Sequence, residues 1–319
     1  MKFLITGGAG YIGAHLGTAL QNAGHQVKIY DDFSNGLERR CVDRFDDVIR
    51  GSILDKNLLS HQMRGIDVVV HLAAKKAVGE SVTKPDYYFE NNVIGSKNIL
   101  EAMESANVNK IFFSSTAAVY NVNENKLIGE NSTLSPLSPY GKNKLEIERF
   151  ISRKCEEVGI SAITLRYFNV VGCGDYSLSD NSQENLVPKV FAAVDAGKSP
   201  LIYGSDYETI DGTCIRDYVH VLDLINAHLM LLESFQPGRN QILNIGSGMG
   251  YSVKQVINTI EEVIGFSVKA QTVSRREGDV ATLVADISKV KNFCQWQPKE
   301  NLHSMIVSSW NGWVKNRVK

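Results

Sequence analysis

The chain has 319 residues, of which 43% are hydrophobic and 22% are charged, and its formal net charge is −1. This composition is typical of a globular protein of about two domains and excludes a disordered chain. A net charge so close to zero gives no general attraction for nucleic acid or anionic membranes, so we expect neither as a partner. Any anionic ligand must be held by locally placed arginines.

The five cysteines are scattered along the chain, with no CxxC motif and no histidine at metal-ligand spacing. This pattern indicates reduced thiols and predicts no metal site. No apolar run approaches the roughly 18 residues that a membrane span needs. The first residues lead straight into an expected strand, so we predict a cytoplasmic protein without a signal peptide.

A strand, a glycine-rich turn and a helix open the chain. The apolar run 2–6 ends in Gly7-Gly-Ala-Gly-Tyr-Ile-Gly13, and the helical pattern that follows stops at Gly24. Glycines in such a turn let backbone N–H groups approach a diphosphate at the helix N-terminus. The next strand, 26–30, ends in Asp31-Asp32, whose carboxylates would accept ribose hydroxyls and repel a 2′-phosphate. The sequence therefore predicts NAD binding and disfavours NADP.

Further strands are expected at 47–50, 67–72, 110–115 and 161–166, alternating with helices. We therefore predict an α/β fold with a doubly wound parallel Rossmann sheet in residues 1–170. Residues 171–319 would form a smaller mixed α/β domain for the substrate. Its expected elements are helices near 184–196, 221–234 and 252–264 and strands near 201–203 and 241–245. Segments such as 215–235 could pack back on the first domain.

Polar side chains follow the expected strands at their carboxyl ends, where doubly wound folds bind ligands. His71 is predicted to be a core histidine, and at least one of Lys75 and Lys76 a cofactor contact, although both could be solvated. The hydroxyls of residues 114–116 either donate to a reacting oxygen or cap the strand end. Asn91 and Asn92 either bridge strands or touch the cofactor.

The main catalytic candidate is the stretch Ser138-Pro-Tyr-Gly-Lys-Asn-Lys144. Ser138 and Pro139 suit the N-cap and first turn of a helix, which places Tyr140 and Lys144 four residues apart on one face. The lysine cation is expected to lower the pKa of the tyrosine from its usual value of about 10. Tyr140 could then exchange protons with a sugar or alcohol hydroxyl. The alternative is an ordinary pair on a solvated helix face.

Arginines in two expected loops are candidates for binding a diphosphate. Arg216 is followed by Asp217, and Arg275-Arg276 are followed shortly by Asp279. An arginine fork matches diphosphate geometry, but each of these arginines could instead form a surface ion pair with its acidic neighbour.

Together these motifs resemble the extended short-chain dehydrogenase/reductase family, and within it the UDP-hexose 4-epimerases. The similarity runs through nearly the whole chain in the same motif order. It is carried by residues 7–13, 71–81 with Lys84-Pro85, 91–95, 114–120, Tyr140 with Lys144, 166–169, 216–220 and 275–279.

The resemblance implies redox-neutral 4-epimerisation of a UDP-hexose through a 4-keto intermediate, with transient reduction of bound NAD. Tyr140 would act as base and then as acid, Lys144 would hold ribose hydroxyls, and Thr116 would hydrogen-bond the sugar oxygen. The resemblance also implies a homodimer formed through helices near Asn91 and Tyr140.

The positions that match the family's NAD contacts are Gly7, Gly10, Tyr11, Ile12, Gly13, Asp31, Asp32, Phe33, Ser34, Asn35, Gly36, Ser52, Ile53, Leu72, Ala73, Ala74, Lys76, Asn91, Ser114, Tyr140, Lys144 and Phe168. Those that match its UDP-sugar contacts are Thr116, Tyr140, Asn169, Asn185, Leu201, Tyr203, Arg216, Arg276, Asp279 and Leu283.

The chain departs from the family pattern at three positions. Ser52 replaces the aspartate that usually binds adenine, which predicts looser NAD binding. Asn121 replaces a usual glycine and could keep the same turn, because asparagine tolerates positive φ. Leu283 replaces the large tyrosine that excludes N-acetyl groups, so UDP-N-acetylglucosamine and UDP-N-acetylgalactosamine become plausible substrates.

Two other functions compete with epimerisation. Sugar dehydratases and decarboxylases of the family usually place an acid after the threonine, where this chain has Ala117-Ala118. A non-catalytic NAD-sensing protein would have no need of Tyr140, Lys144 and Thr116 together.

Overall fold

A computed structural model describes residues 1–120, 127–276 and 278–317. The chain divides into two compact units, each assembled from several stretches of sequence. Unit 1 comprises Met1–Tyr120, Leu134–Arg166 and His228–Leu243, and unit 2 comprises Asn121–Thr133, Tyr167–Ala227 and Asn244–Lys319.

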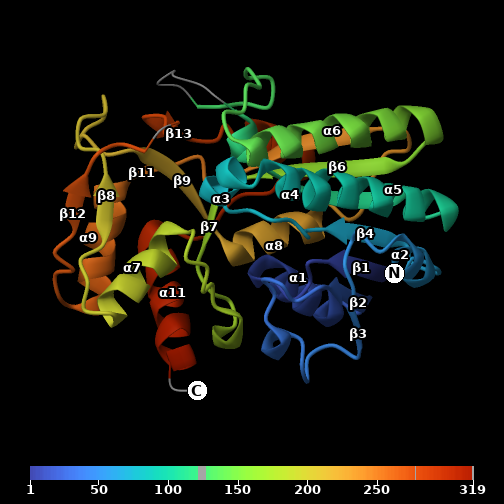
Figure 1. Cartoon of the computed structure of the whole chain (residues 1–319), viewed down its shortest axis with the longest axis horizontal. Coiled ribbons are helices and arrows are strands. Elements are labelled where there is room, and N and C mark those ends of the chain that lie inside the picture. Colours follow the sequence, from blue (N-terminus) through green and yellow to red (C-terminus); the bar gives the residue numbers. More distant parts are fainter. Residues whose placement is uncertain (121–126, 277, 318–319) are drawn as a thin grey trace. The chain divides into compact units, whose positions relative to one another are not determined.

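A seven-stranded sheet forms the centre of unit 1 (Figure 1). Its strands are β1 (Lys2–Thr6), β2 (Gln26–Asp31), β3 (Asp47–Arg50), β4 (Val68–His71), β5 (Lys110–Thr116), β6 (Ser161–Tyr167) and β10 (Asn240–Ile245). They lie in the order β10-β6-β5-β4-β1-β2-β3. The pairs from β3 through β5 are parallel, with Ile5 opposite both Ile29 and Val70. The doubly wound α/β fold predicted from the sequence is confirmed.

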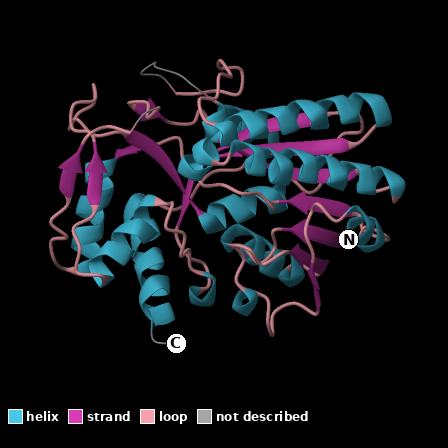
Figure 2. Ribbon diagram, viewed as in Figure 1, coloured by secondary structure: helices cyan, strands magenta, loops and turns pink. Residues whose placement is uncertain are grey.

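Helices flank this sheet, and Figure 2 shows how they are layered against the strands. They are α1 (Tyr11–Asn22), α2 (Lys56–Gln62), α3 (Val78–Thr83), α4 (Pro85–Phe89), α5 (Gly95–Ser105) and α6 (Pro139–Val158), with short helices η1 (Glu38–Arg40) and η3 (Ala117–Val119). The side chains of α2, α5 and α6 share one core with those of β1, β4 and β5. Because both faces are covered, three successive valines of β4 are buried, which is typical of parallel strands.

The helical structure between residues 85 and 105 is interrupted. The structure has α4, then a π-helical segment, η2 (Glu90–Ile94), and then α5. Asn91 and Asn92 lie in that segment and are buried. A π-helical turn widens the helix locally and is frequent at functional sites, and hydrophobic spacing does not reveal it.

The sequence predicts that the strand near 241–245 belongs to the second region, and this prediction is wrong. The strand is β10 and extends the main sheet beyond β6. Ala162 N donates to Arg239 O at 2.9 Å, and Thr164 Oγ1 donates to Asn240 Oδ1 at 2.8 Å. The alternation of apolar residues predicts a strand here, but it carries no information about which strand is its neighbour.

Unit 2 has a smaller sheet formed by β7 (Asn169–Val171), β9 (Ile215–His220), β11 (Gly250–Ser252) and β13 (Thr282–Leu283). A separate parallel pair joins β8 (Leu201–Tyr203) to β12 (Gln271–Val273). The helices are η4 (Tyr176–Leu178), α7 (Leu186–Asp195), α9 (Val253–Ile264), α10 (Ser288–Cys294) and α11 (Leu302–Arg317), and α8 (Val221–Met230) begins here and ends in unit 1. Buried side chains of α7, α9 and α11 form the core.

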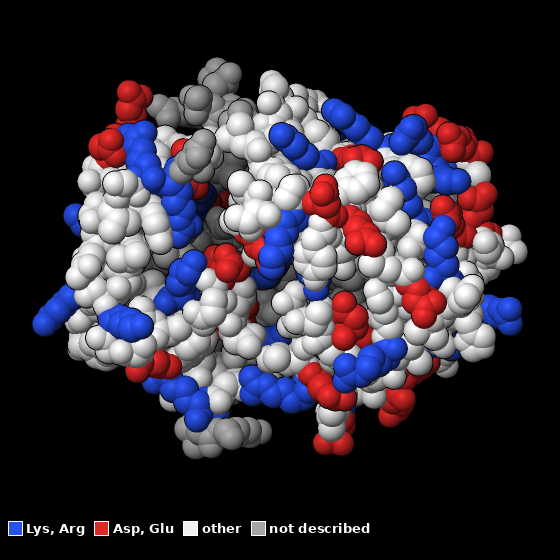
Figure 3. Space-filling model, viewed as in Figure 1, with Lys and Arg blue, Asp and Glu red and all other residues white. Residues whose placement is uncertain are grey.

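Two further features of the chain are the apolarity of its helices and the charge on its surface. In the parts that the structure describes, no helix combines the length and apolarity that a membrane span requires. On the face drawn in Figure 3, basic and acidic side chains are interspersed, in keeping with the net charge of −1.

Candidate active site

The glycine turn forms the first part of the site, at the carboxyl end of β1. Helix α1 begins after Gly10, which as N-cap offers no side chain to bond the first-turn N–H groups. A Cβ on Gly7 would lie 2.6 Å from Ala73 N, and one on Gly13 would lie 2.5 Å from Gly7 O. Both contacts are too short for any side chain, so the turn needs glycine at these positions. The uncapped helix N-terminus suits the diphosphate of a dinucleotide.

Asp31 ends β2 and faces this turn. Its carboxylate accepts hydrogen bonds from Ala9 N at 2.9 Å and Phe33 N at 2.8 Å. Burial raises the pKa of this carboxyl, and the two N–H bonds oppose that shift. Next to it, Asp32 accepts from the N–H and the hydroxyl of Ser34. Two carboxylates are therefore held at the strand end where ribose hydroxyls are recognised in such folds.

The segment after β4 is fixed by Asn92. Lys75 N donates to Asn92 Oδ1 at 2.8 Å, and Asn92 Nδ2 donates to Lys75 O at 2.9 Å. Asn91 donates to the same Oδ1, so the asparagines brace the segment. Lys75 is 8% exposed, and its Nζ donates to Ser34 Oγ at 2.6 Å, whereas Lys76 is exposed.

Ser52 and Ile53 follow β3, where the family contacts adenine. Ser52 O accepts from the Tyr30 hydroxyl at 2.9 Å, and Ser52 Oγ accepts from Leu54 N at 3.2 Å. Ile53 is buried, and a Cβ on Gly95 would collide with it. A serine hydroxyl keeps one free acceptor site, but without a charge, so the expectation of looser NAD binding stays a prediction.

Tyr140, Lys144 and Thr116 come together where α6 meets the end of β5. Ser138 Oγ accepts from Gly141 N at 3.1 Å and Pro139 opens α6, as predicted. Lys144 Nζ donates to Ser114 O at 2.7 Å and lies 6.0 Å from the centroid of the Tyr140 ring. The side chains of Thr116 and Tyr140 are hydrogen-bonded to each other. Lys144 is 3% exposed and both Tyr140 and Thr116 are half-buried, so this constellation is not an ordinary solvated pair.

The expectation that Lys144 lowers the pKa of Tyr140 is wrong for this structure. Burial raises the pKa of Tyr140 to about 12, and only the hydrogen bond with Thr116 opposes it. Burial also lowers the pKa of Lys144 to about 7, with Glu148 opposing the shift. Desolvation is the largest cause of both shifts, with Lys144 3% exposed and Tyr140 half-buried.

The remaining polar residues at this edge of the sheet are hydrogen-bonded to neighbouring protein groups. His71 is a core histidine, as predicted, bonded to Thr6 Oγ1 at 2.8 Å and Ser96 Oγ at 2.7 Å. Burial lowers its pKa to about 3, so it stays neutral. Ser115 donates to Glu148, and Thr116 caps the following turn by accepting from Ala118 N at 3.2 Å.

Unit 2 brings together three of the expected sugar-nucleotide contacts around β9. Arg216 donates from Nη1 to Ile215 O and Val280 O, and its Nη2 lies 3.4 Å from Asp279 Oδ1. Leu283 stands opposite Arg216 in the parallel pairing of β13 with β9. The ion pair foreseen for Arg216 thus exists, but with Asp279 and not with Asp217.

Tyr203 and Arg276 form a second group in unit 2. The Arg276 guanidinium carbon lies 3.7 Å from the centroid of the Tyr203 ring. Its neighbour Arg275 instead pairs with Asp206 at 2.8 Å and covers the ring of Tyr207. Leu201, at the start of β8, is 41% exposed.

Three other expected contacts of unit 2 have partners of their own. Phe168 is buried, and its N–H donates to Ile245 O at 3.0 Å. Asn169 Nδ2 donates to Asp217 O at 3.0 Å, and Asn185 Nδ2 donates to Asp180 Oδ2 at 2.6 Å. Except for Phe168, the expected NAD contacts belong to unit 1. Except for Thr116 and Tyr140, the expected UDP-sugar contacts belong to unit 2. Asn121 lies outside the described residues.

The sequence reasoning gave no role to Glu148 or Tyr120, which lie beside this constellation. Glu148 is bonded to Ser115 and Arg166, and Arg166 is bonded in turn to Tyr120. The available signal was position, because Glu148 lies one helical turn after Lys144 on the same face of α6.

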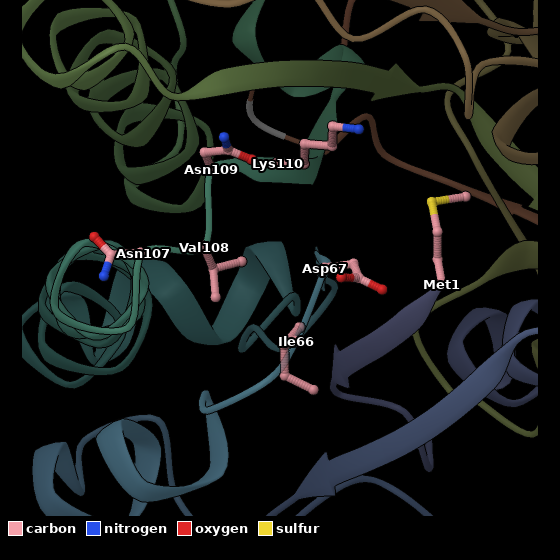
Figure 4. A pocket seen from close by; sticks show the side chains of 7 residues that line it. All are labelled: Met1, Ile66, Asp67, Asn107, Val108, Asn109 and Lys110. Carbon is pink, nitrogen blue, oxygen red and sulfur yellow. The ribbon is translucent and has the colours of Figure 1, made fainter.

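A cavity of about 350 Å³ opens elsewhere in unit 1, lined by Met1, Ile66, Asp67 and residues 107–110 (Figure 4). Its lining residues lie just before β1, β4 and β5 or, for Lys110, at the first position of β5. It therefore lies at the amino ends of these strands. In doubly wound sheets ligands bind at the carboxyl ends, so this cavity is not the candidate site.

Comparison with known proteins identifies relatives over the full chain. Residues 3–246 match the family described as NAD dependent epimerase/dehydratase. A UDP-glucose 4-epimerase of Corynebacterium glutamicum is 40% identical over 315 residues, which covers 97% of this chain and 95% of the relative.

Two solved structures are similar in fold and sequence. That of UDP-glucose-4-epimerase from Stenotrophomonas maltophila, with bound NAD and formylated UDP-arabinopyranose, has a TM-score of 0.92, 35% identity and complete coverage of both chains. That of the UDP-Glc/GlcNAc 4-epimerase from Campylobacter jejuni has a TM-score of 0.82 and 35% identity, and covers 98% of this chain and 99% of the other.

Proposed function

The chain belongs to the NAD dependent epimerase/dehydratase family, and we propose that it interconverts UDP-glucose and UDP-galactose by redox-neutral 4-epimerisation. The observation that carries this proposal is the grouping of buried Lys144 with half-buried Tyr140 and Thr116, in the same unit as the glycine turn. It is supported by the UDP-glucose 4-epimerase of Corynebacterium glutamicum, which is similar along nearly its whole length.

The residues of unit 1 fit a bound NAD. Glycine is required at the turn, the N-terminus of α1 is uncapped, and the Asp31 carboxylate is fixed where it can accept ribose hydroxyls. NAD would supply the acceptor and donor of hydride for carbon 4 of the sugar. Lys144 Nζ donates one of its three N–H groups to Ser114 O, so two N–H groups remain to bind ribose hydroxyls.

Tyr140 would take the proton of the sugar 4-hydroxyl and later return it. This gives a 4-keto sugar that can turn over in the site before it is reduced on its other face. Thr116, bonded to Tyr140, is placed to hold the same sugar oxygen. Since burial favours the neutral phenol, positive charge beside it is needed for the phenolate to form. Protonated Lys144 contributes that charge.

Unit 2 would anchor the UDP group. Arg216 is held by two backbone carbonyls and by Asp279, so its guanidinium is oriented before a ligand binds. A pre-oriented fork suits two oxygens of a diphosphate. Arg276 has no carboxylate partner within the described residues, and its charge over Tyr203 is available to an anion.

A second substrate class is UDP-N-acetylglucosamine and UDP-N-acetylgalactosamine. Leu283, half-buried opposite Arg216, is smaller than the tyrosine that the family resemblance implies at this position, and would therefore obstruct an acetamido group less. The similar structure from Campylobacter jejuni is described as an enzyme of both UDP-glucose and UDP-N-acetylglucosamine.

The test is to incubate the purified protein with UDP-galactose, and separately with UDP-N-acetylgalactosamine, and to follow the 4-epimer by NMR. We expect UDP-glucose from the first reaction, and Tyr140→Phe should lose at least about 10²-fold in rate while NAD remains bound. Tyr176→Phe, an exposed tyrosine of unit 2, is the control. Absence of conversion of either substrate with NAD supplied would overturn the proposal.

We also propose a homodimer. Support comes from the resemblance and from apolar side chains exposed on α3 and α4, among them Val82 (64%), Tyr87 (46%) and Phe89 (39%). Light scattering after gel filtration would give the mass in solution, and a monomer at micromolar concentration would contradict the proposal. The cytoplasmic location stays a prediction.

A further inference from the structure

Glu148 of α6 and Arg166 of β6 form an ion pair inside unit 1, with 2% and 1% of their surfaces exposed. Arg166 donates from Nε to Glu148 Oε1 at 2.9 Å and from Nη2 to Oε2 at 2.6 Å. This two-pronged geometry fixes the position of the carboxylate as well as its charge.

Such a pair needs a reason other than stability. Taking two charges out of water is costly, and well-packed apolar residues of the same size often stabilise a fold equally well or better. A bidentate pair kept at 1–2% exposure therefore suggests a role in the site beside it.

The pair holds both ends of the segment that carries Thr116. Ser115, immediately before Thr116, donates its hydroxyl to Glu148 Oε1. Tyr120, which follows the short helix η3 after Thr116, accepts from Arg166 Nη1 at 2.7 Å. A shift of the Glu148 carboxylate would therefore move the Thr116 hydroxyl relative to Tyr140.

The same carboxylate acts on Lys144, one helical turn earlier on α6. The groups that surround Lys144 are Glu148, the neutral His71, the ring of Phe113 at 4.8 Å and the ring of Tyr140 at 6.0 Å. Of these only Glu148 is an anion, and its attraction opposes the loss of the Lys144 proton that burial favours.

We propose that Glu148 is a positioning residue for Tyr140, Lys144 and Thr116: through Ser115 and Arg166 it fixes the end of β5, and its charge keeps Lys144 cationic. This inference rests on the proposed function for its meaning in catalysis. Its effect on Lys144 is measurable without substrate.

The first experiment follows the charge of Lys144 by NMR of protein carrying ¹³C at the lysine ε positions, with the Lys144 signal assigned by its absence in Lys144→Met. In Glu148→Gln we expect the titration midpoint of Lys144 to fall by about one pH unit or more, because the attracting charge is removed. The control is Glu146→Gln, which removes an exposed partner of Lys97 from the same helix. An unchanged midpoint in Glu148→Gln overturns the inference.

The second experiment separates positioning from folding. Glu148→Gln removes the carboxylate that balances the buried charge of Arg166, so it should destabilise unit 1, whereas Glu148→Gln with Arg166→Met removes both charges and should recover most of the stability. We expect the Lys144 midpoint to stay low in the double variant, and the high-pH limb of kcat/KM to move downward with it. If the midpoint and the pH profile recover together with stability, the role is structural and the inference falls.

The two failures are distinguishable. A wild-type protein that converts no UDP-hexose defeats the proposed function, and the Lys144 midpoint still decides the inference about Glu148.

Discussion

Lys144 of α6 is 3% exposed and bonded to Ser114 O of β5, and an ammonium group loses most of its hydration in such a place. The same burial that lowers the pKa of Lys144 to about 7 raises that of Tyr140 to about 12. The two residues that the proposed reaction needs in charged form are thus those that the fold makes costly to charge. Perturbed pairs of this kind are frequent at catalytic sites.

Replacing Lys144 with methionine should stabilise the protein at neutral pH. The pKa of Lys144 is about 7 in the folded chain against 10.5 ordinarily, so the unfolded chain binds more protons between these values and stability rises with pH across the window. At pH 7 the cost of the charge is roughly 3–5 kcal/mol, less about 1 kcal/mol for the lost bond to Ser114 O.

We therefore expect Lys144→Met to unfold at higher urea concentration than wild type at pH 7, with the difference shrinking toward pH 10. The variant should not epimerise. The control is Lys154→Met, which removes a more exposed lysine of α6 that is paired with Glu104 of α5. It should change stability by less than about 1 kcal/mol. A methionine variant less stable than wild type at pH 7 would show that the buried charge costs little.

Lys75 should contribute to NAD affinity. It is 8% exposed, bonded to Ser34 beside the two aspartates, and has no carboxylate in ion-pair range among the described residues. A buried cation without an anion favours an anionic ligand, and one charge-assisted hydrogen bond is worth about 1.5–2 kcal/mol. Lys75→Met should raise the Kd for NAD about tenfold in calorimetry and weaken its salt dependence. Lys97→Met is the control, and equal affinities would contradict the assignment.

At the residue scale, the sequence predicted which residues come together better than it predicted their pKa values. Spacing placed Tyr140 and Lys144 together, and the cap Ser138 and the turn glycines are where their chemistry requires them. Burial depends on what packs over a residue, which spacing does not record, so the pKa of Tyr140 was predicted with the wrong sign. Glu148 was missed because its partners Ser115 and Arg166 are distant in sequence.

Strand β9 shows how one buried side chain organises an element and its neighbours. Asp217 is fully buried, and its carboxylate accepts from Ser247 N, Gly248 N and Ala285 N at 2.6, 2.9 and 3.1 Å. It thereby fastens the turn after β10 and the residues after β13 to β9, the strand that carries Arg216. The sequence suggested Asp217 only as a surface partner of Arg216, because acidic residues next to arginines are usually exposed.

Asp217→Asn should destabilise the protein by about 2–4 kcal/mol. One carboxylate oxygen becomes an amide NH₂, which cannot accept the hydrogen bonds of its two donors, and each buried unsatisfied donor costs about 1–3 kcal/mol. Urea unfolding would measure the change. Asp206→Asn, which removes an exposed partner of Arg275, should cost less than about 1 kcal/mol. Equal effects of the two substitutions would show that the hydrogen bonds of Asp217 do not stabilise the fold.

For the whole molecule, the alternation of strands and helices sufficed to predict the sheet as far as β6. It failed at β10, which reaches the sheet after more than 70 intervening residues. Local patterns specify that a strand forms, whereas its neighbour is decided by long-range packing. The two units are correspondingly interleaved in sequence, with 228–243 returning to unit 1.

This interleaving predicts that residues 1–170 do not fold as an independent NAD-binding domain. Without β10, strand β6 becomes an edge, although all seven of its residues are buried in the full chain. An exposed apolar edge promotes pairing with other chains. We expect the fragment to aggregate or to unfold without a cooperative transition, and to bind no NAD in calorimetry. The full chain should unfold cooperatively and bind NAD. A monomeric fragment that unfolds cooperatively and binds NAD would show that the first six strands suffice, and that β10 only extends a sheet already stable without it.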